Sequence, residues 1–98
     1  MAEINWTTEA QTWLRDIFDY IAEDNRSAAA TVVEGIYDRA QILRDLPHIG
    51  YRYEAISDRE IRILLYGHYR IAYHVKSKEE IDILGVFHGA LDVSRYLV

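Results

Sequence analysis

The first part of the chain repeats apolar residues at helical spacing. Leu14, Ile17, Phe18 and Ile21 recur at i, i+3, i+4 and i+7 with charged residues between them. This pattern predicts an amphipathic helix with one apolar face. The segment Thr8-Glu9-Ala10-Gln11 has the residue types of a capping box, in which two side chains satisfy unpaired amides of the first turn. We therefore expect the helix to begin at Thr8.

A second helix follows after a polar break at residues 23–27, whose Asn and Ser are residues that cap helices. Apolar residues keep the helical period from Ala29 to Leu46, and Pro47 and Gly50 then give a stop signal. Two helices joined by so short a turn predict an antiparallel helical hairpin.

In the second half of the chain, apolar residues recur at every second position, the spacing of a β-strand. Residues 61–66 (IRILLY) are rich in β-branched and aromatic residues, and residues 69–75 alternate strictly after a turn at Gly67 and His68. After a polar turn at residues 76–80, residues 81–88 are apolar on both faces except for Asp82 and the terminal His88, which is typical of a central strand.

A short opening strand at residues 3–6 and a last short helix after Gly89 complete the pattern. The order β-α-α-β-β-β predicts an α+β domain, with the helical hairpin packed on one face of a mostly antiparallel sheet. Residues 1–98 are few enough to form a single domain.

The charge balance narrows the classes of function. Sixteen acidic and eleven basic residues give a net charge of -5, which argues against a general polyanion binder. There is no cysteine, so thiolate metal sites and cysteine nucleophiles are excluded. No secretory signal occurs and no apolar segment approaches the roughly 20 residues that span a bilayer. We expect a cytoplasmic protein without a membrane partner.

Basic side chains concentrate on the predicted strand pair, where residues 51–76 hold five basic and three acidic residues. Arg70 and His74 share one face of a strand and Arg62 lies on the neighbouring strand, so the three are candidate phosphate-binding residues. His88, at the end of an apolar strand, is a candidate proton donor to a leaving oxygen. The alternative is that the arginines only pair with nearby carboxylates. The histidine spacings predict neither a metal site nor a cofactor.

Aromatic residues flank the apolar stripes of both helices. Trp13 and Tyr20 lie beside the stripe of the first helix, and Tyr37 lies beside that of the second. They either complete the core or extend the stripes into a surface for a protein partner. Tyr69 and Tyr73, on the apolar face of their strand, are expected in the core.

Several short motifs occur in a characteristic order along the chain. They are Leu46-Pro47-His48-Ile49-Gly50, Arg62-Ile63-Leu64, Tyr69-Arg70-Ile71-Ala72-Tyr73 and Val86-Phe87-His88. Together with the order of elements, they resemble the RelE/ParE toxin superfamily of bacterial type II toxin-antitoxin systems. The resemblance covers essentially the whole chain.

The resemblance implies a toxin of the plasmid-stabilisation type that is neutralised by a cognate antitoxin. The complex of the two would bind DNA only through the antitoxin. Trp13, Tyr20 and Tyr37 are the expected antitoxin contacts. ParE-like members poison DNA gyrase, whereas RelE-like members cut mRNA on the ribosome without a metal. Arg70 and His88 match the nuclease pattern as its catalytic residues, but Ala90 stands where a second Arg is expected. We therefore expect a gyrase poison. An mRNA endonuclease and a non-toxic, antitoxin-binding regulator are the alternatives.

Overall fold

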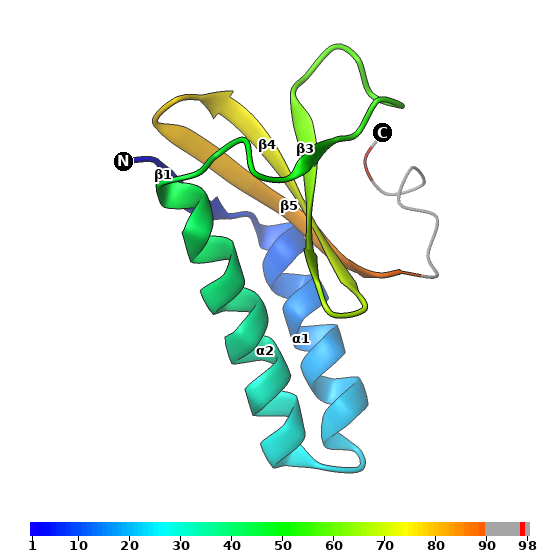
Figure 1. The fold of residues 1–98 in the computed structure, drawn as a ribbon. Helices are drawn as coiled ribbons and strands as arrows, with labels where there is room; N and C mark the ends of the chain where they lie inside the picture. The colour runs from blue at the N-terminus through cyan, green and yellow to red at the C-terminus, as the bar shows by residue number, and fades with distance from the viewer. Residues whose placement is uncertain (90–96, 98) are drawn as a thin grey trace.

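The computed structural model describes residues 1–89 and Leu97, and the predicted elements follow one another in the expected order (Figure 1). The elements are β1 (Glu3–Trp6), α1 (Thr8–Ala22), α2 (Arg26–Ala40), the 3₁₀ helix η1 (Gln41–Arg44), β2 (Tyr51–Arg52), β3 (Ile61–Tyr66), β4 (Tyr69–Ser77) and β5 (Glu80–His88). The two-residue strand β2 was not expected. The helix expected after Gly89 falls, apart from Leu97, outside the described residues.

The five strands form one sheet in the order β1-β5-β4-β3-β2. β1 runs parallel to β5, and every other neighbouring pair is antiparallel. The predicted α+β class and mostly antiparallel sheet are thus confirmed. β5 lies between β1 and β4, and its interior position explains why its sequence is apolar on both faces.

The helical hairpin covers one face of this sheet, and the main core lies between them. Figure 1 shows the two helices side by side, with the turn that joins them far from β1. The buried residues of this core are Ala2, Ala10, Ile36, Ala40, Leu43, Leu64, Ile71, Tyr73, Val75, Ile81, Ile83 and Val86. A second cluster on the opposite face contains Ile56, Ile61, Ile63, Ala72, Phe87 and Leu97. Both α1 and α2 have fifteen residues, and none of the described helices has the length and apolarity to cross a bilayer.

A register shift in β5 decides which face its last residues occupy. Tyr73 pairs with Ile83 but Ala72 pairs with Gly85, so Leu84 is an extra residue. Because a β-bulge of one residue inverts the alternation beyond it, Val86 and not Gly85 continues the helix-facing row of β5.

The first helix begins at Thr8, as predicted, but its capping residue differs from the capping-box prediction by one position. Thr7, not Thr8, is the N-cap, and its hydroxyl accepts a hydrogen bond from the amide of Ala10 at 3.1 Å. The same hydroxyl donates to the carbonyl of Ile83 at 2.7 Å. Thr7 directly follows β1, and the pairing of β1 with β5 places its hydroxyl beside Ile83. This pairing therefore determines that Thr7 caps the helix. Gln11 uses its side-chain amide on the carbonyl of Trp6 instead of closing a capping box.

The second helix has the predicted start and a shorter length than predicted. Asn25 caps it, with its side-chain oxygen 2.9 Å from the amide of Ala28. The α-helix ends at Ala40, and the helical spacing toward Leu46 continues as the 3₁₀ helix η1. The antiparallel hairpin itself is confirmed.

Candidate functional site

An apolar groove lies between α1 and the adjacent ends of β4 and β5. Its volume is about 580 Å³, within the range of pockets that hold ligands or partner side chains. Its lining residues are Trp13, Asp16, Ile17, Tyr20, Tyr69, Val86 and His88. Most of them are apolar or aromatic, so the groove is suited to an apolar segment of another molecule.

The side of the groove that α1 provides consists of residues at helical spacing. Residues i, i+4 and i+7 of a helix share one side, and Trp13, Ile17 and Tyr20 have this spacing. Trp13 is held in place, because its ring packs edge-on against Phe87 at 4.7 Å between centroids. Tyr20 is 79% exposed. Trp13 is therefore part of the groove wall, whereas Tyr20 is an accessible rim.

The third aromatic residue expected to contact a partner lies elsewhere. Tyr37, on α2, stacks on Trp6 with ring centroids 5.7 Å apart. It lines a separate hollow beside β1 and is 47% exposed. The structure thus brings Trp13 and Tyr20 together and leaves Tyr37 outside the groove.

The three predicted phosphate-binding residues are divided between the two faces of the sheet. Arg62 is paired with Tyr73, on the helix-facing side. Arg70 is paired with Leu65, and His74 with Ile61, on the opposite side. The structure keeps Arg70 and His74 on one face, as predicted, but Arg62 cannot share a ligand with them across the sheet.

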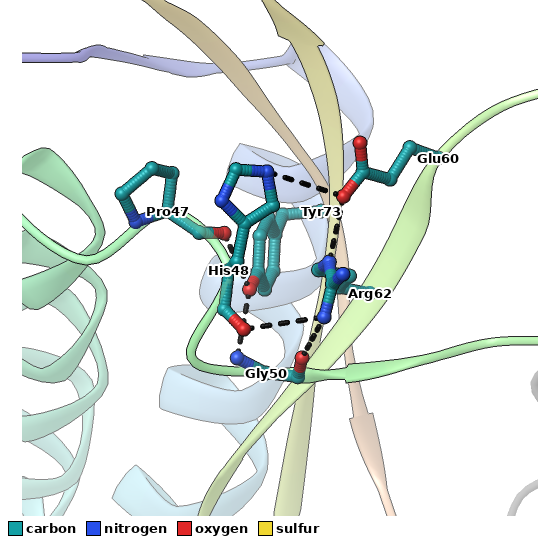
Figure 2. A network of polar contacts seen from close by, with 6 residues as sticks. All are labelled: Pro47, His48, Gly50, Glu60, Arg62 and Tyr73. Atoms are coloured by element: carbon teal, nitrogen blue, oxygen red, sulfur yellow. Dashed lines mark hydrogen bonds and ion pairs between the residues drawn. The ribbon is translucent and has the colours of Figure 1, made fainter. Parts of the chain in front are cut away.

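Arg62 is engaged in holding the loop that precedes β2 (Figure 2). Its guanidinium donates to the carboxylate of Glu60 at 2.8 Å, to the carbonyl of His48 at 3.2 Å and to the carbonyl of Gly50 at 2.7 Å. Pairing with a nearby carboxylate was the alternative to phosphate binding, and for Arg62 it is the observed arrangement.

Tyr73 fastens the same loop from inside the core. Its side chain is fully buried, and its hydroxyl donates to the carbonyl of Pro47 and accepts from the amide of Gly50, both at 2.9 Å (Figure 2). Burial raises the pKa of this hydroxyl, so it stays protonated and able to donate. The core position of Tyr73 was predicted, but its hydrogen bonds were missed. A buried tyrosine hydroxyl requires a partner, and the polar backbone around Pro47 was the available signal.

Glu60 is the negatively charged member of the network that Arg62 and His48 form around this loop. The hydrogen bond from Arg62 is the main cause that lowers the pKa of the Glu60 carboxyl, and His48 adds to it at 3.4 Å. A carboxyl whose pKa is lower in the folded than in the unfolded state stabilises the fold above its unfolded pKa. That contribution is lost as the pH falls through the folded pKa.

Replacing Glu60 with glutamine should therefore reduce the stability of the protein at pH 7 but not in acid. We expect a loss of about 1 kcal/mol in the free energy of unfolding at pH 7, since the pair is partly exposed. The difference from the wild type should shrink as the pH falls below 4.5. Urea titrations over this pH range measure it. Glu54→Gln, at an exposed carboxylate, is the control, and an equal pH dependence in both variants would contradict the role of Glu60.

His74 contributes little positive charge to its face of the sheet. Burial lowers the pKa of this imidazole, and the positive charge of Arg59 lowers it further. It lies opposite Asp82 in the register of β4 and β5. A neutral imidazole at pH 7 is a weaker ligand for a phosphate group than a cationic one.

Arg70 and His88, the candidate catalytic pair, line one hollow of about 320 Å³ at the end of the sheet. They approach it from different sides, because His88 is paired with Tyr69 on the helix-facing side and Arg70 with Phe87 on the other. Ala90 lies outside the described residues. Across residues 1–89 and Leu97, no three histidine or acidic side chains gather as metal ligands would.

Comparisons with known proteins agree with this fold. A family model described as ParE toxin of type II toxin-antitoxin system, parDE, matches residues 4–93. A solved structure described as the chromosomal ParDE TA system from P. aeruginosa is similar, with a TM-score of 0.74 and 24% sequence identity. The likeness covers 90% of this chain and 96% of that one, and at this identity it shows the fold alone. Among curated proteins, none matches the sequence.

Proposed function

Because the chain belongs to the ParE family of toxins from type II toxin-antitoxin systems, we propose that it stops growth by binding and poisoning DNA gyrase in the cytoplasm. A cognate antitoxin neutralises it. The observation that carries the proposal is the family match, which extends over residues 4–93 of a 98-residue chain.

The apolar groove is the proposed site of the antitoxin. A partner helix that enters such a groove fills it with apolar side chains at i, i+3, i+4 and i+7. Trp13 supplies a fixed aromatic wall and Tyr20 an accessible rim. Rigid aromatic residues of this kind carry much of the binding energy of protein interfaces. Tyr37 has no part in the groove, so we assign it no contact there.

A departure from the nuclease pattern supports a toxin that binds its target and does not cut RNA. Ala90 stands where that pattern has a second arginine. Arg70 and His88 line one hollow although they leave opposite faces of the sheet, so the placement of these two residues does not separate the two activities.

Expression of the chain without its antitoxin tests the proposal. We expect growth arrest, induction of the DNA-damage response and gyrase trapped on DNA, with mRNA left intact in primer extension. Codon-phased mRNA cuts that disappear in Arg70→Ala and His88→Ala would instead identify an endonuclease. Normal growth at full expression would identify a regulator that binds the antitoxin without being toxic.

A further inference from the structure

A carboxylate lies among the apolar and aromatic side chains of the groove. Of the described residues that line the groove, Asp16 is the only one with a carboxyl group. An aspartate carries a negative charge at neutral pH. The side chain of Asp16 is exposed, so in the free toxin water solvates this charge.

The position of Asp16 on α1 places it in the middle of the groove wall. Trp13, Asp16, Ile17 and Tyr20 stand at i, i+3, i+4 and i+7, the spacing of a single helical stripe. Three of these four side chains are apolar or aromatic, as a stripe that contacts a partner requires. Asp16 occupies the remaining position, between Trp13 and Tyr20. A partner that packs along this stripe therefore covers Asp16 as well.

Covering this carboxylate has a cost that depends on the partner. An apolar partner surface would remove water from the charge and give nothing in return, which is strongly unfavourable. A lysine or arginine at the same place would pair with the carboxylate by a charge-assisted hydrogen bond. In coiled coils, a single polar residue in an apolar seam selects partners in this way, because mismatched partners pay the penalty of an unpaired polar group.

The other charges of α1 favour a basic partner too. Besides Asp16, the helix carries Glu9 and Asp19 against the single base Arg15. Asp19 lies three residues after Asp16, and like charges at this spacing destabilise a helix slightly. The helix therefore gains no stability from having an acidic residue at position 16. A negative surface attracts a basic segment and steers its approach.

We propose that Asp16 selects the antitoxin by requiring a lysine or arginine in the helix that fills the groove. The partner is thus an apolar helix with one basic residue on the stripe that faces the toxin. This inference rests on the antitoxin site proposed above. It adds the chemistry by which the groove distinguishes its own antitoxin from an equally apolar helix that lacks the base.

Calorimetric titration of Asp16→Leu with the cognate antitoxin tests this requirement. Leucine extends the apolar stripe and favours helix more than aspartate does, so the toxin should stay folded. We expect antitoxin affinity to fall about tenfold, because the basic side chain would be covered without a partner. Asp19→Leu is the matched control, since Asp19 is an exposed aspartate of the same helix that does not line the groove. It should leave the affinity unchanged.

A second change, in the antitoxin, identifies the basic residue. Each lysine and arginine of the antitoxin is replaced with leucine in turn and titrated against the Asp16→Leu toxin. One replacement should restore the affinity of the wild-type pair, because two apolar side chains can take the place of a buried ion pair without loss. If no replacement restores it, the loss does not come from an unpaired base and the proposal is wrong.

The direction of the effect separates this proposal from the antitoxin site on which it rests. Tighter or unchanged binding in Asp16→Leu, together with weaker binding in Tyr20→Ala, would overturn the requirement for a base and leave the groove as the antitoxin site. Unchanged binding in both variants would overturn the groove as the antitoxin site, and the role of Asp16 with it.

Discussion

Replacing Gly50 with alanine should lower the free energy of unfolding by about 3 kcal/mol, through overpacking and the loss of a buried hydrogen bond. A Cβ at this position would lie 2.6 Å from the carbonyl oxygen of Ile63 and 2.7 Å from the hydroxyl of Tyr73. The first contact is with the backbone of β3, which cannot move without disturbing the sheet. The second displaces the hydroxyl that holds both Pro47 and Gly50. Urea unfolding followed by circular dichroism measures the effect.

Two further variants separate the causes of this loss of stability, namely backbone strain, overpacking and the lost hydrogen bond. Gly67→Ala is the matched glycine control, because its backbone φ is 56° but no atom lies within 4 Å of the added Cβ. Only backbone strain is introduced there, at a cost of about 1 kcal/mol. Tyr73→Phe leaves the amide of Gly50 buried without a partner, at a cost of about 2 kcal/mol. If Gly50→Ala cost no more than Gly67→Ala, the close approach of the loop to β3 would be refuted.

The second large effect concerns the antitoxin. Tyr20→Ala should weaken antitoxin binding about thirtyfold, the loss that corresponds to about 2 kcal/mol for an interface hot spot. The side chain is 79% exposed on the groove rim, and alanine favours helix. The fold should therefore keep its stability. Calorimetric titration of the toxin with its antitoxin gives the affinity, and thermal unfolding of the free toxin gives the stability.

Tyr37→Ala is the matched control for this variant. Tyr37 is also an exposed tyrosine on the hairpin, but it lies outside the groove, so antitoxin affinity should change less than twofold, or by about 0.4 kcal/mol. Equal losses at the two tyrosines would show that the groove is not the binding site. Trp13 is unsuitable for this test, because its ring packs on Phe87 and its removal would destabilise the fold together with the groove.

Periodicity predicted the elements well where one face of each is buried. The strand at residues 61–66 matches β3, and the apolar run at residues 81–88 lies within β5. The helix cap was wrong by one residue, because Thr7 and Thr8 are chemically alike and only the pairing of β1 with β5 selects between them. The strand β2 has two exposed residues and no apolar alternation, so local pattern could not reveal it.

The placement of the candidate site residues could be predicted from the sequence only in part. The two-residue turn at Gly67 and His68, which was predicted, pairs Arg62 with Tyr73 and Arg70 with Leu65. The division of the arginines between the two faces could therefore have been worked out from the sequence. The position of His88 could not, because it depends on the bulge at Leu84. No alternation within an apolar run marks where an extra residue is accommodated.

The pairing of β1 with β5 also determines when this toxin is able to fold. β1 and β5 are neighbours in the sheet, and the hydrogen bond from Asn5 to Asp82 spans 77 positions of the chain. Contacts so distant in sequence form late, because a long loop must close first. A growing chain can form its helical hairpin on the ribosome, but β1 has no neighbour in the sheet until β5, residues 80–88, has been made. The groove, which needs Val86 and His88, is therefore completed only after residue 88 has been made, and an antitoxin that uses it cannot capture a shorter nascent fragment.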